Sequence, residues 1–187
     1  MYLIAGLGNP GKEYEDTRHN LGFEVIGRLA IEHGTVLKND RKFRAKAAKT
    51  DLGSAKAVLL SPQTFMNLSG QAVKAAADYY KIPAEKVVLV YDDIDLEEGR
   101  VRIKIGGGSA GHKGVESVIE HLNARDFIRV RIGAGRPVLK EASDHVLSRL
   151  EEDKRDVFSS AINTAALAVV EIVANGPEAA MNQFNGV

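Results

Sequence analysis

The chain has 187 residues, its 25 Lys and Arg balance 25 Asp and Glu, and 44% of its residues are hydrophobic. These values exclude a disordered chain and fit an ordinary water-soluble protein with one domain covering residues 1–187. Because cysteine is absent, disulfides and thiolate chemistry are excluded, and a zinc site would need His and carboxylate ligands alone.

The start of the chain does not resemble a targeting signal. The apolar residues 2–5 have no basic residue before them and lead directly into Gly and Pro. No other stretch approaches the roughly 20 apolar residues of a membrane span. We therefore expect a cytoplasmic protein without a membrane partner.

The first part of the chain alternates strand and helix patterns. An apolar run ending at Gly6 predicts a buried strand, and residues 7–19 show no regular period. Asn20 is a candidate N-cap for a helix that Gly34 ends. Two strand patterns at 43–50 and 56–61, joined by a turn, predict a β-hairpin. A helix pattern follows at 67–81.

The second part begins with a continuous apolar run at 87–91, which predicts a central strand covered on both faces, with Asp92 just past its end. Basic and apolar residues alternate at 100–105 and 127–134, which predicts two half-exposed strands. Helix patterns occupy 115–123 and 143–185. This interleaving predicts a three-layer α/β domain, a twisted mixed β-sheet flanked by helices.

Three glycine-rich patterns are misleading. Residues 6–11 match the dinucleotide-binding pattern, but no helix follows to hold a pyrophosphate. Residues 107–111 match a serine nucleophile elbow, yet the strand before them alternates basic and apolar residues and is not fully buried. Residues 106–113 resemble a phosphate-binding loop, but His112 stands where that loop needs Lys. A nicotinamide oxidoreductase or a nucleotide hydrolase therefore has little support.

Four segments together resemble the bacterial peptidyl-tRNA hydrolase family in order and spacing. They are GLGNPG at 6–11, TRHN at 17–20, TFMNLSG at 64–70 and GGGSAGH at 106–112. The similarity extends to the strand that ends near Asp92 and to AMNQFN at 180–185. It implies a monomeric enzyme that hydrolyses the ester joining a peptide to the terminal ribose of tRNA, without a metal or cofactor.

The resemblance assigns catalytic roles. An ester needs an activated water, and a His held by a carboxylate supplies a base near neutral pH, so His19 is the expected general base and Asp92 its partner. By themselves, one His and one Asp more often form a structural hydrogen bond than a catalytic pair. The resemblance to the family makes the catalytic pair the favoured interpretation here. Asn67 is expected to donate to the carbonyl oxygen or substrate backbone, and Asn9 to recognise the peptide bond of a blocked aminoacyl group.

The expected substrate contacts lie around these residues. Tyr14 and Phe65 resemble positions that line the site for the tRNA end, although core packing is an equal alternative for Phe65. Met66 is expected to shape the pocket wall, and His112 to contact the substrate. Basic side chains on the exposed faces of the alternating strands are candidates for tRNA phosphate contacts: Arg102, Lys104, Arg129 and Arg131.

One position departs from the family pattern. Lys113 replaces the usual Asn after His112, and a Lys can donate a hydrogen bond but cannot accept one. The basic residues also gather at 38–49, where solvated faces of a neutral protein are the simpler interpretation.

The main alternative function keeps the fold without catalysis, as in RNA-splicing relatives of the family, which would use a basic face to bind RNA.

Overall fold

The computed structural model describes residues 1–53, 55–136, 146–148 and 151–186. They contain a seven-stranded mixed sheet with the strand order β2-β3-β4-β1-β5-β7-β6. The strands are β1 (Tyr2–Gly6), β2 (Lys38–Asp40), β3 (Ala45–Leu52), β4 (Ala55–Pro62), β5 (Val87–Asp93), β6 (Val101–Ile105) and β7 (Ile128–Gly133). The predicted hairpin is confirmed, because β3 and β4 pair antiparallel.

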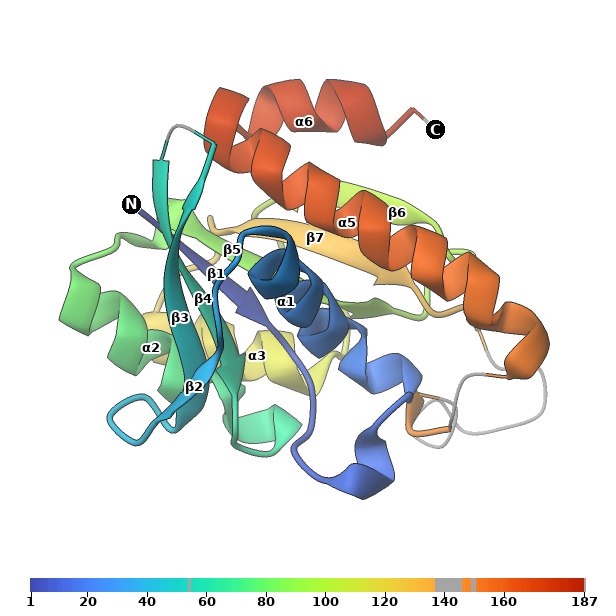
Figure 1. The fold of residues 1–187 in the computed structure, drawn as a ribbon, viewed down its shortest axis with the longest axis horizontal. Helices are drawn as coiled ribbons and strands as arrows, with labels where there is room; N and C mark the ends of the chain where they lie inside the picture. The colour runs from blue at the N-terminus through green and yellow to red at the C-terminus, as the bar shows by residue number, and fades with distance from the viewer. Residues whose placement is uncertain (54, 137–145, 149–150, 187) are drawn as a thin grey trace.

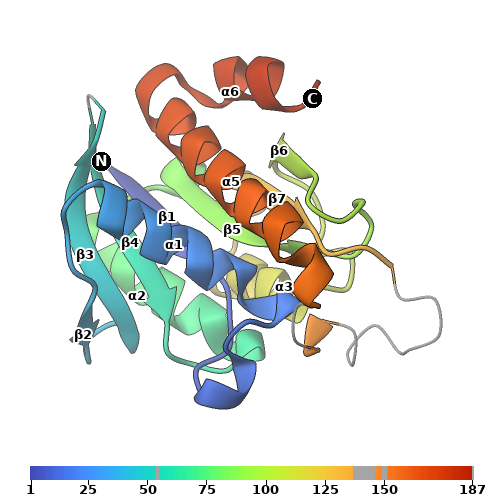
Figure 2. The ribbon, with the colours of Figure 1, turned by 45° about the vertical axis from the view of Figure 1, so that its right-hand side comes forward.

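Helices cover both faces of the sheet, so the predicted three-layer α/β architecture is confirmed (Figure 1). The face that carries Ile4, Val88 and Val90 packs against α1 (Leu21–Glu32) and α5 (Arg155–Asn175), which lie side by side in Figure 2 as well. The opposite face packs against α2 (Ser69–Tyr80) and α3 (Lys113–Leu122). A last helix, α6 (Pro177–Phe184), lies along the β6 edge.

The middle of the sheet is parallel and fully covered. β1 pairs parallel with β4 and β5, and β5 pairs parallel with β7. Every residue of β5 is buried, as the continuous apolar pattern predicts. The expected end of this strand is wrong, because Asp92 and Asp93 still pair with Ile132 and Gly133 of β7. Two carboxylates are thus held inside the sheet at its carboxyl edge.

Two glycines bring α1 unusually close to this edge. A Cβ added to Gly6 would lie 2.1 Å from the carbonyl oxygen of Gly22, and one added to Gly22 would lie 2.5 Å from the backbone of Leu7. Only glycine fits such an approach of helix to strand. The short 3₁₀ turn Arg18–Asn20 that leads into α1 is therefore seated beside the end of β5.

Other boundaries differ from the sequence predictions. β2 has only three residues and no apolar alternation, so its pattern was too short to detect. The helical pattern expected at 143–185 is not continuous in the described residues, because Gly176 takes a positive φ of 92° and separates α5 from α6. Residues 143–145 and 149–150 of that prediction lie outside the described residues.

The helical segment Glu152–Asn175 is long and apolar enough to cross a membrane by length and composition, contrary to our expectation that no stretch is. Its apolar side chains pack into the protein, since Phe158, Ala165, Val169 and Ile172 are fully buried in the core with the sheet. Core packing therefore explains the composition of this helix.

Candidate active site

A cavity of about 630 Å³ opens at the carboxyl edge of the parallel strands, where ligands bind in sheets of this kind. Most of the predicted site residues line it: Asn9, Tyr14, His19, Phe65, Met66, Asn67, Asp92, His112 and Lys113. They come from the loops after β1 and β4, from the end of β5 and from the start of α3. The sheet topology thus brings together segments that are far apart in the sequence.

Asp92 lines this cavity and is 1% exposed. Its Oδ1 is 2.8 Å from Nδ1 of His19 and 3.2 Å from Nε2 of His112. Burial raises the pKa of Asp92, but the two neighbouring imidazoles more than offset it, so the pKa lies well below the ordinary value of 3.8. The side chain is therefore a carboxylate that accepts from both rings.

The two histidines differ in what their second nitrogen does. Nδ1 of His112 accepts hydrogen bonds from the backbone N–H groups of Gly114 and Val115, at 3.1 and 3.3 Å, and so caps α3. These bonds place the proton of His112 on Nε2, which donates to Asp92. When Nδ1 of His19 donates to Asp92, its Nε2 keeps a free lone pair and has no partner among the described residues.

The same three residues could be considered as a metal site, because one ligand atom of each lies within 4.8 Å of the others. The hydrogen bonds argue against this. His112 would have to bind the ion through Nε2 while its Nδ1 still accepts two backbone N–H groups, which leaves no nitrogen for its proton. The donor set therefore fits a hydrogen-bonded His–Asp–His cluster better than a cation.

Asn9 is fixed by its neighbours. Its Oδ1 accepts the backbone N–H of Met66 at 2.8 Å, and its own backbone N–H donates to Oδ1 of Asn20 at 2.7 Å. The amide NH₂ of Asn9 is the group left to donate into the cavity. Asn20 occupies the N-cap position of α1, as predicted, but its side chain makes no cap bond and instead brackets the backbone of Asn9.

The cavity walls combine rigid and accessible side chains. Phe65 is 59% exposed, so the core-packing alternative for it is wrong. Met66 is buried in the core beside Leu7, and a Cβ on Gly114 would lie 2.4 Å from its sulfur, which explains a glycine there. Asn67 is exposed and makes no hydrogen bond within the described part of the chain. Its amide is therefore available to a ligand.

The basic candidates on β6 and β7 do not all lie on an exposed surface, contrary to our prediction. Arg129 is 2% exposed, and its guanidinium donates to the carbonyl groups of Gly107 and Gly108, so it holds the glycine-rich loop. Arg131 is paired with Asp93 at 2.7 Å, and Arg102 donates to the carbonyl of Asn185. Lys104 alone of the four is exposed, without an ion pair in the described residues.

Several cavity residues had no signal in the sequence. Val146 and Leu147 add an apolar wall, and Ile94 lies beside Asp93. Buried Arg18, next to His19, donates to Oγ of Ser148 at 3.0 Å and pairs with Glu98 at 3.3 Å, which ties that wall to the turn that carries His19. Its partners are 80 and 130 residues away, so no local pattern reveals them.

Known proteins resemble the chain along its whole length. The family model described as Peptidyl-tRNA hydrolase matches residues 3–187. The peptidyl-tRNA hydrolase of Caldanaerobacter subterraneus subsp. tengcongensis is 50% identical over 186 residues, covering 100% of both chains, and that of Thermoanaerobacter sp. (strain X514) is 48% identical with the same coverage.

A solved structure agrees. The crystal structure of peptidyl-tRNA hydrolase from Acinetobacter baumannii superposes with a TM-score of 0.92 at 39% identity, covering 99% of this chain and 94% of that one. The family model, the relatives and the solved structure all point to the same family. In this chain the fold of that family carries the His–Asp–His cluster at the carboxyl edge of its sheet. The chain belongs to the peptidyl-tRNA hydrolase family.

Proposed function

We propose that the chain hydrolyses the ester between a peptide and the terminal ribose of tRNA, with His19 as the general base. The observation that carries the proposal is the 2.8 Å contact between Nδ1 of His19 and buried Oδ1 of Asp92. This contact orients the ring and leaves Nε2 as the proton acceptor. The non-catalytic RNA-binding alternative gives no reason for such a pair inside a cavity.

The reaction needs only water and these side chains. Nε2 of His19 takes a proton as a water oxygen bonds to the ester carbonyl carbon, and the Asp92 carboxylate stabilises the imidazolium that forms. The amide of Asn67 donates to the carbonyl oxygen, where negative charge develops. When the tetrahedral intermediate collapses, the bond to the ribose oxygen breaks and His19 returns its proton to that oxygen.

Selectivity for a peptide rests on Asn9. Its NH₂ is held in place because its Oδ1 is bonded to Met66, so it can meet the carbonyl of the peptide bond next to the ester. An unblocked aminoacyl group has no such carbonyl. Chains with a blocked amino terminus are therefore the preferred substrates.

The tRNA end is proposed to lie along Tyr14 and Phe65, with Lys113 near its phosphates. Lys104 is exposed on β6 and does not line the cavity, so it is proposed to meet a phosphate farther along the tRNA. Arg131 remains a candidate for a phosphate contact because its side chain is 23% exposed. Arg129 is buried and is no longer a candidate for such a contact. We further propose that the protein works as a single-domain monomer in the cytoplasm, where its substrate is formed.

The test is a comparison of two substrates on the same tRNA. Purified protein should hydrolyse N-acetyl-aminoacyl-tRNA and spare the unblocked aminoacyl-tRNA by at least about two orders of magnitude, the discrimination that an unpaired buried donor provides. Equal rates would contradict the role of Asn9. The absence of hydrolysis with either substrate would leave the RNA-binding alternative.

A further inference from the structure

The sheet edge opposite β6 carries a dense group of cations outside the candidate active site. It consists of six side chains within residues 38–49, called here the basic edge: Lys38, Arg41, Lys42, Arg44, Lys46 and Lys49. All six are exposed, on β2, on β3 or in the turn between them. Asp40 is the single acidic residue of this stretch, and its Oδ1 accepts the backbone N–H of Lys42 at 2.9 Å.

Several cations elsewhere in the chain are paired with carboxylates, but those of the basic edge are not, within the described residues. Arg28, Lys74 and Arg136 lie within 4.0 Å of a carboxylate, whereas no member of the basic edge has such an ion pair within the described ranges. The chain is neutral overall, so this edge holds an uncompensated positive charge. A field of this kind attracts polyanions.

Aromatic rings hold two of the ammonium groups in place. Nζ of Lys42 lies 3.8 Å from the ring centroid of Tyr79, and Nζ of Lys49 lies 4.8 Å from that of Tyr80. Both rings pack on Phe43, which is buried, at centroid distances of 5.4 and 5.6 Å. Cation–π contacts of this kind fix a charge without neutralising it.

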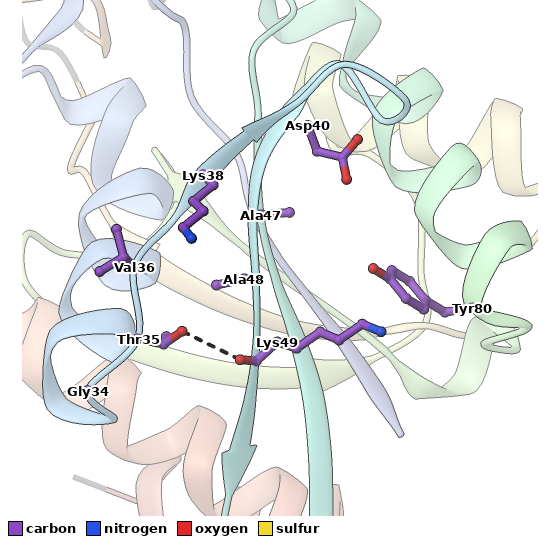
Figure 3. Close-up of a pocket in the computed structure, with 9 residues that line it drawn as sticks. All are labelled: Gly34, Thr35, Val36, Lys38, Asp40, Ala47, Ala48, Lys49 and Tyr80. Carbon is purple, nitrogen blue, oxygen red and sulfur yellow. Dashed lines mark hydrogen bonds between the residues drawn. The ribbon is translucent and has the colours of Figure 1, made fainter.

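A concavity of about 460 Å³ lies beside these groups, with Lys38, Lys49 and Tyr80 in its lining. Figure 3 shows the Lys49 side chain extending toward the ring of Tyr80, with the Asp40 carboxylate on the same side of the strand. The space is large enough for a ribose and its phosphates. Because lysines already lie over both tyrosine rings, stacked bases are not the ligand that these rings favour.

From these observations we infer that the basic edge is a second RNA-binding surface, which holds the sugar–phosphate backbone without reading sequence. It is a separate surface from the cavity, since β4 and β1 stand between β3 and the catalytic strand β5, about 14 Å at the usual strand spacing. The two regions are nevertheless joined: the N–H of Gln63, two residues before Phe65, donates to the carbonyl of Arg44 at 2.8 Å. The inference goes beyond the proposed function, because binding at this edge needs no ester in the cavity.

The test uses the full chain and a duplex RNA hairpin that lacks an aminoacyl group. The double variant Lys42→Gln/Lys49→Gln removes two charges. Lys86→Gln is the control for the loss of a lysine charge outside the basic edge, because Lys86 is also exposed and lies 5.9 Å from a tyrosine ring, that of Tyr2. The double variant should bind the hairpin roughly tenfold more weakly at low salt, and the slope of log affinity against log salt should fall by about two. Lys86→Gln should match the wild type.

Unchanged affinity and salt slope in a folded double variant, as judged by its Tm, would overturn the inference. Equal binding of a polyglutamate peptide of matched charge would also overturn it, since the surface would then recognise any polyanion. An increased KM for N-acetyl-aminoacyl-tRNA in the double variant would show that the bound RNA is the body of the substrate, and an unchanged KM with weakened hairpin binding would indicate a separate RNA. Hairpin binding through these lysines by a chain without hydrolytic activity would contradict the proposed function and support this inference.

Discussion

His19 and His112 lie 5.0 Å apart between ring centroids because both imidazoles bond to the same oxygen of Asp92. The contact of His19 is the shorter one, and the second nitrogen of His112 is used by the backbone of α3. Of the two rings, only His19 keeps a nitrogen free to accept a proton from water. The hydrogen bonds thus fit the proposed roles of His19 as the base and of His112 as a positioning residue.

The positioning role of His112 predicts different effects for two substitutions. His112→Asn keeps an N-cap for α3 but loses the bond to Asp92, whereas His112→Ala loses both. Both should lower kcat about tenfold, the effect of one hydrogen bond to a charged group, with little change in KM. Unfolding in urea should show His112→Ala to be about 1 kcal/mol less stable than His112→Asn. A wild-type kcat in His112→Asn would remove His112 from the positioning of Asp92.

The lowered pKa of Asp92 predicts how the free energy of unfolding depends on pH. Its pKa in the folded protein lies below the ordinary 3.8, so the unfolded chain takes up the proton first as the pH falls. The contribution of the carboxylate is therefore complete above its unfolded pKa and is lost as the pH falls toward the folded one. Between pH 5 and pH 2.5, wild type should lose free energy of unfolding more steeply than Asp92→Asn. Parallel curves in urea titrations over this range would contradict the lowered pKa.

The two asparagines of the cavity should respond differently to removal. Asn67 has no hydrogen bond within the described residues, so Asn67→Ala should leave the Tm unchanged and lower kcat about 10- to 100-fold through the lost donor. Asn9→Ala leaves the buried N–H of Met66 without its acceptor, so it should also cost about 1–3 kcal/mol of stability. Parallel assays of hydrolysis and thermal unfolding separate the two. Full activity in Asn67→Ala would exclude it from the oxyanion contact.

Much of this arrangement could be predicted from sequence because its signals are local. The apolar run of β5 and the alternation in β6 and β7 predict the sheet and its layers, and the four motif segments contain nine of the sixteen residues that line the cavity. Asn9 and His19 lie in such segments, so their neighbours in the chain identify them.

The rest depends on contacts between distant segments. Alternation in β7 cannot distinguish a solvated face from one that a loop covers. The prediction of an exposed Arg129 is therefore wrong, because its guanidinium donates hydrogen bonds to the carbonyl groups of Gly107 and Gly108. The two bonds of His112 to α3 also require coordinates, because a His that precedes a helix in the sequence need not turn a ring nitrogen toward the helix N–H groups. The Arg18 contact with Ser148 joins positions 130 residues apart.

Lys113 is predicted to act as a charge toward the tRNA. It is exposed at the first position of α3 and lines the cavity, so its ammonium can meet a phosphate of the tRNA end. Lys113→Asn should keep hydrolysis at low salt and reduce the dependence of log KM on log salt by about one contact, and Lys113→Glu should raise KM strongly. Superimposable salt slopes for the wild type and both variants would show that Lys113 is solvated and does not touch the substrate.

The central claim is that His19 deprotonates the attacking water. Single-turnover hydrolysis of N-acetyl-aminoacyl-tRNA by wild type and His19→Ala tests it most directly, with the Kd for the tRNA measured on the same preparations. The rate constant should fall about 10²- to 10⁴-fold, as expected for loss of a general base, while the Kd stays within about threefold, because the base acts mainly in the transition state. A near-normal rate constant in folded His19→Ala that binds tRNA would contradict the mechanism.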